Sequence, residues 1–366
     1  MRGCRLAAAL ALVATSLATL LGCEDAAQQH EITSAGELLT PAGRLREPGW
    51  SRRELLHWDE ARVHDRSRLR AWDFFALQND QYAANFTLFD LGFIQLASVT
   101  VVDFATGQKF ESRNLGGVLS LSTGVEGSTV ASYRADAAAP AQLAFSTTPE
   151  GTTTVQIALP ALFGPAASGQ ITIARRPGMP YLSLATPFAD DPTNFFYEQK
   201  LPGLGAGGFV TVDGRSFAFD PSTTIATMDW GRGQWPAEVT WRWAAGATSV
   251  NGVPLSFNFG EGFGDPSHGS ENFVSLGDAV SKYGAVRWNF DRTDPLRPWT
   301  LRSSDGRIYL VLTPVAPETG GLDLGDKYNL LHKAYGTFAG SIELDDRQTV
   351  QLQGVRGFAE EMQLSW

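Results

Sequence analysis

The chain has 366 residues, of which 43% are hydrophobic, 11% aromatic and 19% charged. This composition supports one large core or two medium ones, and it excludes a disordered, coiled-coil or collagen-like chain. The formal net charge is −10 and there is no run of lysine or arginine, which excludes the basic surface that nucleic-acid binding requires.

The first residues are typical of a bacterial lipoprotein signal. Arg2 and Arg5 precede an apolar run from Leu6 to Leu21, which is shorter than the roughly 20 residues of a membrane span but suits a signal peptide. The run ends in Leu20-Leu21-Gly22-Cys23, which resembles a lipobox. The alternative is an ordinary secretory signal followed by a chance cysteine. We expect cleavage after residue 22 and lipidation of Cys23.

Cysteine use agrees with this interpretation. The chain has 2 cysteines, and Cys4 lies in the segment that cleavage removes. No internal disulfide is then possible. We expect a protein of the bacterial cell envelope, held on the periplasmic side of the outer membrane by its N-terminal lipid anchor only.

Turn-rich sequence without periodicity follows the signal. Residues 24–47 are predicted to form a linker, and a short helix is possible near residues 52–62. Residues 23–65 are therefore expected to form a flexible tether and arm. Period-two alternation then predicts half-buried strands at residues 86–89, 94–102, 153–159, 170–173, 239–243, 255–259, 308–312 and 349–352. Asp213-Gly214 and Asp305-Gly306 are strong hairpin-turn signals, so the pattern predicts an all-β antiparallel sandwich or barrel.

Two familiar motif types can be set aside. Gly203 to Gly208 fits the pattern GxGxxG, but a strand and hairpin follow it, whereas phosphate binding needs a helix there. The histidines are scattered, and Cys23 is expected to be lipidated, so we predict no metal site and no cofactor. The histidines are His30, His57, His64, His268 and His332.

The segment from Asp229 to Trp243 is the most informative. It contains four of the ten tryptophans of the chain. Trp241 and Trp243 share one face of a predicted strand, and Trp230 and Trp235 are expected at the turn before it. These four indoles either fill a core or form the wall of a pocket for an apolar molecule. Asp229 and Arg232 would then orient the ligand, or form a structural ion pair.

A glycine-rich segment follows at residues 260–272. Asp265, His268 and Glu271 place three titratable groups within seven residues. In a dry pocket, an acid with a raised pKa could protonate an apolar substrate. The alternative is a solvated loop whose polar side chains bond to their own backbone.

Many of these segments resemble a bacterial family, the domain of unknown function 2804 family, over residues 31–366. The matching segments are Gly49–Arg52, Trp72–Phe75, Asp90–Phe93, Phe196–Lys200, Asp229–Pro236, Trp241–Trp243, Asn258–Asp265, Ser270–Asn272, Ser303–Arg307, Gly357–Glu360 and Trp366. The family has no assigned reaction. The late Trp-x-Trp strand is more remotely similar to the carotenoid-hydratase and tocopherol-cyclase-like proteins. That resemblance implies two lipocalin-like β-barrel or sandwich units packed side by side, which we place at residues 66–200 and 201–366.

Three functions remain open. The first is binding of a lipid, isoprenoid or other apolar small molecule by Trp230, Arg232, Trp235, Trp241 and Trp243. The second is an acid-catalysed hydratase, cyclase or isomerase with Asp229, Asp265 or Glu271 as proton donor and His268 assisting. The third is a structural envelope protein without a ligand. In each case we expect a monomer that binds no nucleic acid.

Overall fold

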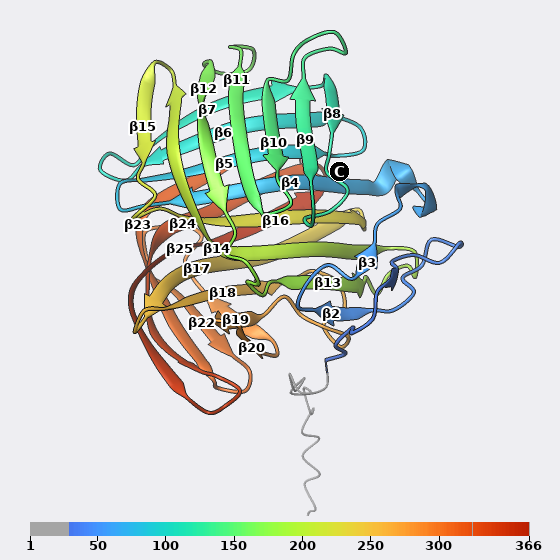
Figure 1. Cartoon of the computed structure of the whole chain (residues 1–366), viewed down its shortest axis with the longest axis vertical. Helices are drawn as coiled ribbons and strands as arrows, with labels where there is room; N and C mark the ends of the chain where they lie inside the picture. The colour runs from blue at the N-terminus through green and yellow to red at the C-terminus, as the bar shows by residue number, and fades with distance from the viewer. Residues whose placement is uncertain (1–28, 324, 366) are drawn as a thin grey trace, which may run out of the picture.

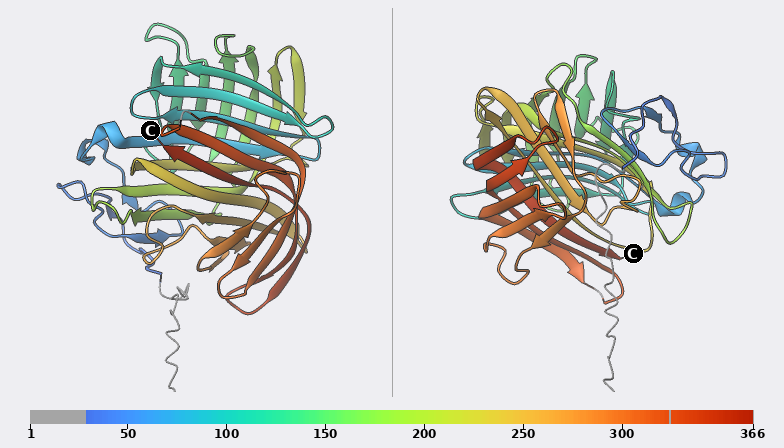
Figure 2. Two further views of the ribbon diagram at one scale, coloured as in Figure 1. Left: turned by 180° about the vertical axis from the view of Figure 1, so that it is seen from behind. Right: turned by 90° about the horizontal axis from the view of Figure 1, so that it is seen from below.

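The computed structural model of the chain describes residues 29–323 and 325–365. The predicted signal peptide and the predicted lipidation site, Cys23, lie outside these residues. Two curled antiparallel sheets make up most of the described chain, and they pack side by side (Figures 1 and 2). The predicted all-β architecture of two antiparallel units is therefore confirmed.

The first sheet is built from strands that lie before residue 235. Its main path has the order β7-β6-β5-β4-β16-β14-β12-β11-β10-β9-β8, while β13 and β15 pair with β14, and β2 pairs with β13. The strands are β2 (Gly49–Ser51), β4 (Leu69–Gln78), β5 (Tyr82–Asp90), β6 (Gln95–Asp103), β7 (Gln108–Leu115), β8 (Val118–Ser120), β9 (Thr129–Arg134), β10 (Leu143–Thr147), β11 (Thr152–Leu159), β12 (Ala167–Ala174), β13 (Leu182–Pro187), β14 (Phe195–Val212), β15 (Arg215–Phe219) and β16 (Ile225–Gln234).

The second sheet has the order β20-β19-β18-β17-β25-β24-β23-β22-β21. Its strands are β17 (Glu238–Val250), β18 (Val253–Glu261), β19 (Phe273–Leu276), β20 (Ala279–Lys282), β21 (Val286–Asn289), β22 (Trp299–Ser303), β23 (Ile308–Asp323), β24 (Tyr328–Glu343) and β25 (Thr349–Ser365). The chain passes from the first sheet to the second between Gln234 and Glu238. The domain boundary that we placed from sequence between residues 200 and 201 lies inside β14. Beyond this position, Leu201 and Leu204 still face the first core.

Part of the predicted linker is packed against the first sheet. Ile32, Leu38 and Leu39 are buried in the first core, so the prediction of a linker is wrong for residues 29–47. This segment forms β1 (Gly36–Glu37), which pairs in parallel with β3 (Leu56–His57). The possible helix at residues 52–62 is reduced to the short 3₁₀ turn η2 (Glu60–Arg62), which is followed by η3 (Arg66–Arg68).

Two sequence signals fold as predicted. Asp213 and Gly214 both have positive φ angles, 53° and 73°, as the tight hairpin between β14 and β15 requires. The GxGxxG segment lies within β14 and is not followed by a helix. It therefore lacks the helix N-terminus that phosphate binding by this motif requires.

Apolar side chains form three layers. One core fills the inside of the first sheet and another fills the inside of the second. A third layer lies between the two sheets, and we call it the seam. Its buried members are Trp72, Ala76, Ala83, Val102, Phe196, Trp235, Val239, Trp243, Ala245, Phe263, Ala316, Tyr335 and Phe358. The seam positions the candidate site described below.

Among the residues that the structure describes, none lies in a helix with the length and apolar character that a membrane crossing requires.

Candidate functional site

Polar side chains from both sheets converge in the seam. Because side chains alternate along a strand, Glu198 and Lys200 of β14 point away from the first core and toward the second sheet. Lys200 lies directly opposite Asp229 of β16 in the strand ladder. The second sheet contributes Asn258 from β18 and Glu271 from the segment before β19. We call these five residues the seam cluster.

Lys200 is the centre of the seam cluster. Its ammonium nitrogen Nζ lies 2.7 Å from Asp229 Oδ2, 3.2 Å from Glu198 Oε2 and 3.6 Å from Glu271 Oε2. All four side chains are buried. Three carboxyl groups therefore share one cation in a place that excludes water. Burial of uncompensated charge is so costly that such groups shift their pKa and become neutral instead.

A missing side chain makes room for Glu271. Gly260 of β18 lies opposite Trp243 in the ladder, and a Cβ atom at this position would come within 1.7 Å of Glu271 Oε1. The carboxyl group occupies the space that any other residue at position 260 would fill.

A short relay of hydrogen bonds orients Glu271. The indole Nε1 of Trp243 donates to Asn258 Oδ1 at 2.7 Å. The amide Nδ2 of Asn258 in turn donates to Glu271 Oε2 at 3.1 Å and to the Glu271 backbone oxygen at 3.0 Å. Trp243 also places its ring centroid 4.0 Å from Lys200 Nζ, a cation–π contact. One indole thus contacts both the amide and the ammonium of the seam cluster.

Burial sets the protonation of the two glutamates. Desolvation, reinforced by the charge of Glu271, raises the pKa of Glu198 well above its ordinary value. Desolvation also raises the pKa of Glu271, although Lys200 and Asn258 act in the opposite direction. For Lys200, burial alone would lower the pKa, but the charges of Asp229 and Glu198 raise it above its ordinary value. Burial therefore favours the protonated form of these two glutamates, while the neighbouring carboxyl groups favour the charged form of Lys200.

Glu198 has spare hydrogen-bonding capacity. Among the described residues, neither of its carboxyl oxygens has a partner with hydrogen-bond geometry, and the same holds for Oδ1 of Asp229 and Oε1 of Glu271. Buried polar atoms are nearly always bonded, so exceptions point to a functional role or an additional bonding partner. These atoms give the seam cluster the capacity to donate a proton to a bound molecule or to accept one from it.

Aromatic side chains close the seam cluster on one side. The Phe263 ring stacks on Phe196 with centroids 4.4 Å apart, and it lies 5.7 Å from Lys200 Nζ. Trp235 packs edge-on against Trp72 at 5.3 Å and against Trp241 at 5.7 Å. We call these five residues the aromatic cluster. It makes the surroundings of the acids apolar, which is the condition that keeps a carboxyl group protonated at neutral pH.

The structure brings together two of the four acid–base residues named from sequence. Asp229 and Glu271 belong to the seam cluster. Asp265 and His268 do not: Asp265 is partly exposed and accepts from the Ser267 backbone at 3.0 Å, and His268 offers its backbone oxygen to His30. For Asp265 the geometry matches the alternative of a loop whose polar side chains bond to their own backbone, whereas His268 contacts the N-terminal segment.

The predicted ligand-orienting pair is separated by strand alternation. Asp229 faces the seam and pairs with Lys200, whereas Arg232 faces the first core and pairs with Asp73 at 2.7 Å. The alternative of an ion pair between Asp229 and Arg232 is therefore wrong. Trp230, expected at a turn, lies within β16, and its Nε1 donates to Ser122 Oγ at 3.0 Å.

The four tryptophans thus occupy different surroundings. Trp235 and Trp241 lie in the aromatic cluster, Trp243 contacts the seam cluster, and Trp230 belongs to the first core. Their assignment as ligand contacts stays a prediction.

Sequence reasoning missed Glu198, Lys200 and Asn258 as site residues. A signal was present for the first two: a glutamate and a lysine two positions apart share one face of a strand whose neighbours Phe195, Phe196, Tyr197 and Leu201 are apolar. Charged residues are almost never fully buried unless they are paired. Their pairing with Asp229 and Glu271 depends on the register of four strands, which no local pattern specifies.

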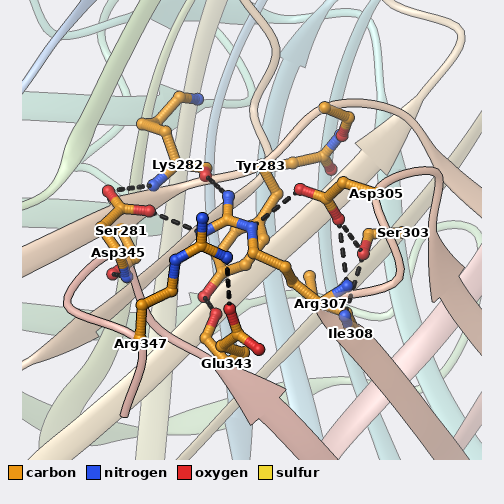
Figure 3. A network of polar contacts seen from close by, with 12 residues as sticks. Ser281, Lys282, Tyr283, Ser303, Asp305, Arg307, Ile308, Glu343, Asp345 and Arg347 are labelled. Carbon is orange, nitrogen blue, oxygen red and sulfur yellow. Dashed lines mark hydrogen bonds and ion pairs between the residues drawn. The ribbon is translucent and has the colours of Figure 1, made fainter. Parts of the chain in front are cut away.

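The segment that carries Glu271 is braced from outside the seam. The side chain of Gln29 accepts from the Ser270 backbone at 2.9 Å and donates to the Tyr283 oxygen at 2.9 Å. Lys282 donates from Nζ to the Ser270 oxygen. The backbone oxygen of Lys282 accepts from Arg307, which also donates to Asp345 at 2.6 Å (Figure 3). This network fixes the loop on which Glu271 depends.

Within the described residues, no group of three or more His, Cys, Asp or Glu side chains is arranged to hold a metal ion.

With this geometry established, the chain can be compared with known proteins. Residues 29–366 match the family described as "Domain of unknown function (DUF2804)". The chain belongs to the DUF2804 family. This confirms the resemblance noted from sequence, and the whole seam cluster lies within the matched range. No curated protein matches the sequence of this DUF2804 protein.

Solved structures share the fold of this DUF2804 protein. It is similar to "CghA with Sch210972", with a TM-score of 0.54 and 15% identity over 81% of this chain and 88% of that chain. A second structure of CghA gives a TM-score of 0.51 and 14% identity over the same shares of the two chains. Kievitone hydratase from Nectria haematococca is more distant, with a TM-score of 0.45 and 15% identity over 81% of this chain and 88% of that chain. At these identities the likeness to CghA shows a common fold.

Proposed function

We propose that this DUF2804 protein is an enzyme that protonates a carbon–carbon double bond of an apolar, isoprenoid-like substrate. The observation that carries the proposal is Glu198: a fully buried carboxyl group with a raised pKa, whose Oε1 has no partner among the described residues and whose Oε2 lies 3.2 Å from Lys200 Nζ. A carboxyl group kept neutral at pH 7 by an apolar site is suited to general-acid catalysis.

In this proposal, Glu198 and Lys200 of the seam cluster have different chemical roles. Glu198 is the proton donor, and its O–H bond breaks as a new C–H bond forms from the π electrons of the alkene. The neighbouring carbon becomes a cation, and the resulting Glu198 carboxylate is stabilised by the nearby Lys200 ammonium. Water can add to the cation and lose a proton to the Glu198 carboxylate, which gives a hydratase. Alternatively, the cation loses a proton to a cluster carboxylate and forms a new double bond, which gives an isomerase. In a cyclase, a second double bond of the same molecule first attacks the cation and closes a ring, and the proton is then lost in the same way. Aromatic faces of the kind that Phe263 and Trp243 present to the cluster stabilise a passing cation.

Substrate entry requires the aromatic cluster to open. Phe263 lies on the segment between β18 and β19 rather than on a strand, and it separates Phe196 from Trp241. An apolar molecule that replaces this ring against Phe196 would lie next to Lys200 and Glu198. Burial of about 100 Å² of apolar substrate surface would offset the lost ring contacts by about 2.5 kcal/mol.

Deuterium incorporation tests the proposal. Purified protein is incubated in deuterium oxide with linear isoprenoid alkenes, and the products are analysed by mass spectrometry. We expect products with one carbon-bound deuterium, with or without added water, and no product from Glu198→Gln. The matched control is Glu360→Gln: Glu360 is also buried in the seam and pairs with Lys333 at 3.0 Å, but it lies outside the seam cluster. Equal turnover by Glu198→Gln and wild type would refute the assignment.

Binding of an apolar molecule without chemistry is the second candidate. It is favoured by a surface groove between the two sheets, which is lined in part by Phe93 and Leu364. If the protein only binds its ligand, Glu198→Gln should carry the same ligand as the wild type after purification. Native mass spectrometry of the two proteins separates the candidates, since only an enzyme requires Glu198 for a change in the mass of the ligand.

We further propose that the protein is a monomeric envelope lipoprotein attached through Cys23. The lipobox-like sequence Leu20-Leu21-Gly22-Cys23 supports this. The mass of the N-terminal peptide from membrane-extracted protein tests it, because lipidation adds acyl chains that Cys23→Ser lacks. An unmodified peptide that begins elsewhere would refute it.

A further inference from the structure

A groove of about 580 Å³ opens on the surface where the two sheets meet. The first sheet and its preceding turn line it with Arg68, Leu91 and Phe93, and the second sheet lines it with Lys327, Tyr328 and Leu364. Its volume lies within the range of about 300–1,000 Å³ that is usual for small-molecule sites.

The groove combines apolar walls with a cationic rim. Phe93 is 69% exposed, and Leu91, Tyr328 and Leu364 continue the apolar surface. Arg68 and Lys327 stand on the two sides of the groove, in a protein whose formal net charge is −10. The acidic neighbour of Arg68 is distant, because 3.9 Å separates Arg68 Nη2 from Asp190 Oδ2. This arrangement complements an apolar molecule with one acidic head group.

The floor of the groove touches the aromatic cluster. The backbone N–H of Trp235 donates to the Arg68 oxygen at 3.2 Å, and Arg68 Nε donates to the Trp235 oxygen at 2.9 Å. The Trp235 ring is 6.0 Å from Phe263, and Phe263 is 5.7 Å from Lys200 Nζ. Trp235 and Phe263 therefore connect the groove with the seam cluster.

We infer that the groove binds the head group of a long-chain carboxylate whose apolar chain extends toward Trp235. Arg68 and Lys327 hold the carboxylate, and Phe93 and Leu364 cover the first part of the chain. The inference rests on the proposed function and narrows its substrate class to unsaturated apolar acids. When the acidic head group is held in the groove, the apolar chain of the bound molecule can carry its double bonds toward Glu198.

Binding of a dansyl-labelled undecanoic acid tests the inference. We expect saturable fluorescence enhancement with the wild type and binding about tenfold weaker for its methyl ester, which lacks the charge. Phe93→Ala and Lys327→Glu should each weaken binding of the acid about tenfold. Their matched controls are Phe163→Ala, which is 60% exposed outside the groove, and Lys109→Glu, and both should bind like the wild type.

The outcomes separate this inference from the proposed function. Equal binding of acid and ester, or equal effects of groove and control variants, would overturn the groove assignment. Binding that appears only after deletion of residue 366 would identify the end of the chain as the occupant and also overturn it. Glu198→Gln should bind the dansyl acid like the wild type while losing deuterium incorporation. Failure of that loss alone would overturn the catalytic role and not the groove.

Discussion

Replacement of Glu198 by glutamine should change how stability depends on pH. The substitution keeps the shape of the side chain and removes its titration. Because the folded pKa of Glu198 is raised above its ordinary value near 4.5, the folded protein retains a proton that the unfolded chain releases as the pH rises. Linkage then requires the wild type to lose stability with increasing pH relative to the variant.

The expected size of this stability difference follows from one bound proton, which the folded state keeps and the unfolded state releases. A difference of one bound proton changes the free energy of unfolding by about 1.4 kcal/mol per pH unit. From pH 5.5 upward the stability of Glu198→Gln should therefore rise relative to the wild type, by at most about 1.4 kcal/mol per pH unit, for as long as only the folded state keeps this proton. The series starts at pH 5.5 because the sequence pI is about 5.0 and proteins precipitate near zero net charge.

Urea unfolding followed by tryptophan fluorescence measures this difference at each pH. Glu361→Gln is the control, because the pKa of Glu361 is shifted in the opposite direction to that of Glu198. Although burial acts the other way, Arg292 and Arg242 lower the pKa of Glu361, so its stabilisation is complete above pH 4.5 and is lost only at lower pH. Glu361→Gln should therefore show a loss that is constant from pH 5.5 to 7.5. A constant difference for Glu198→Gln as well would refute the claim that Glu198 is protonated.

Three further variants test other parts of the structure. Among the described residues, Lys200 is the cation that contacts these three buried carboxyl groups. Urea unfolding of Lys200→Met at pH 7 should therefore show a loss of about 3–5 kcal/mol, and an unchanged midpoint would contradict the central role of Lys200. Gly231→Ala would place a Cβ 2.0 Å from the Trp72 ring and should cost at least 1–3 kcal/mol, whereas Gly205→Ala, with no atom within 4 Å, should have a much smaller effect in the same assay. Burial lowers the pKa of Lys282 to about 7. From pH 7 to 9 the unfolded chain therefore binds a proton that the folded protein lacks, and the wild type should gain stability relative to Lys282→Met. A stability difference that does not change over this range would show that Lys282 stays charged.

The sequence specified the type of fold because its signals are local. Alternation along residues 239–243 and 255–259 predicts β17 and β18, and the Asp213-Gly214 pair predicts the hairpin that the positive φ angles then show. Domain limits were harder to place, since β14 is an 18-residue strand whose residues face the first core beyond position 200. No local pattern marks the end of a sheet.

Two of the four acid–base residues proposed from sequence lie in the seam cluster. Asp229 and Glu271 were recognised because each lies in an unusual segment, whereas Asp265 and His268 lie in the same segment as Glu271 but on its exposed side. Glu198 went unrecognised because its chemistry depends on burial against a second sheet. That burial is a tertiary property, and it arises only when β14 and β16 of the first sheet face β18 of the second sheet across the seam.

Infrared spectroscopy of the protonated carboxyl groups tests the central claim most directly. The carbonyl stretch of a protonated carboxyl group is separate from the bands of carboxylates, and it shifts when the protein is moved to deuterium oxide. At pH 7 the wild type should show this band, and Glu198→Gln should lose the part that Glu198 contributes, while Glu361→Gln retains it. Identical spectra for the wild type and Glu198→Gln would show that Glu198 is ionised and would contradict its role as a proton donor.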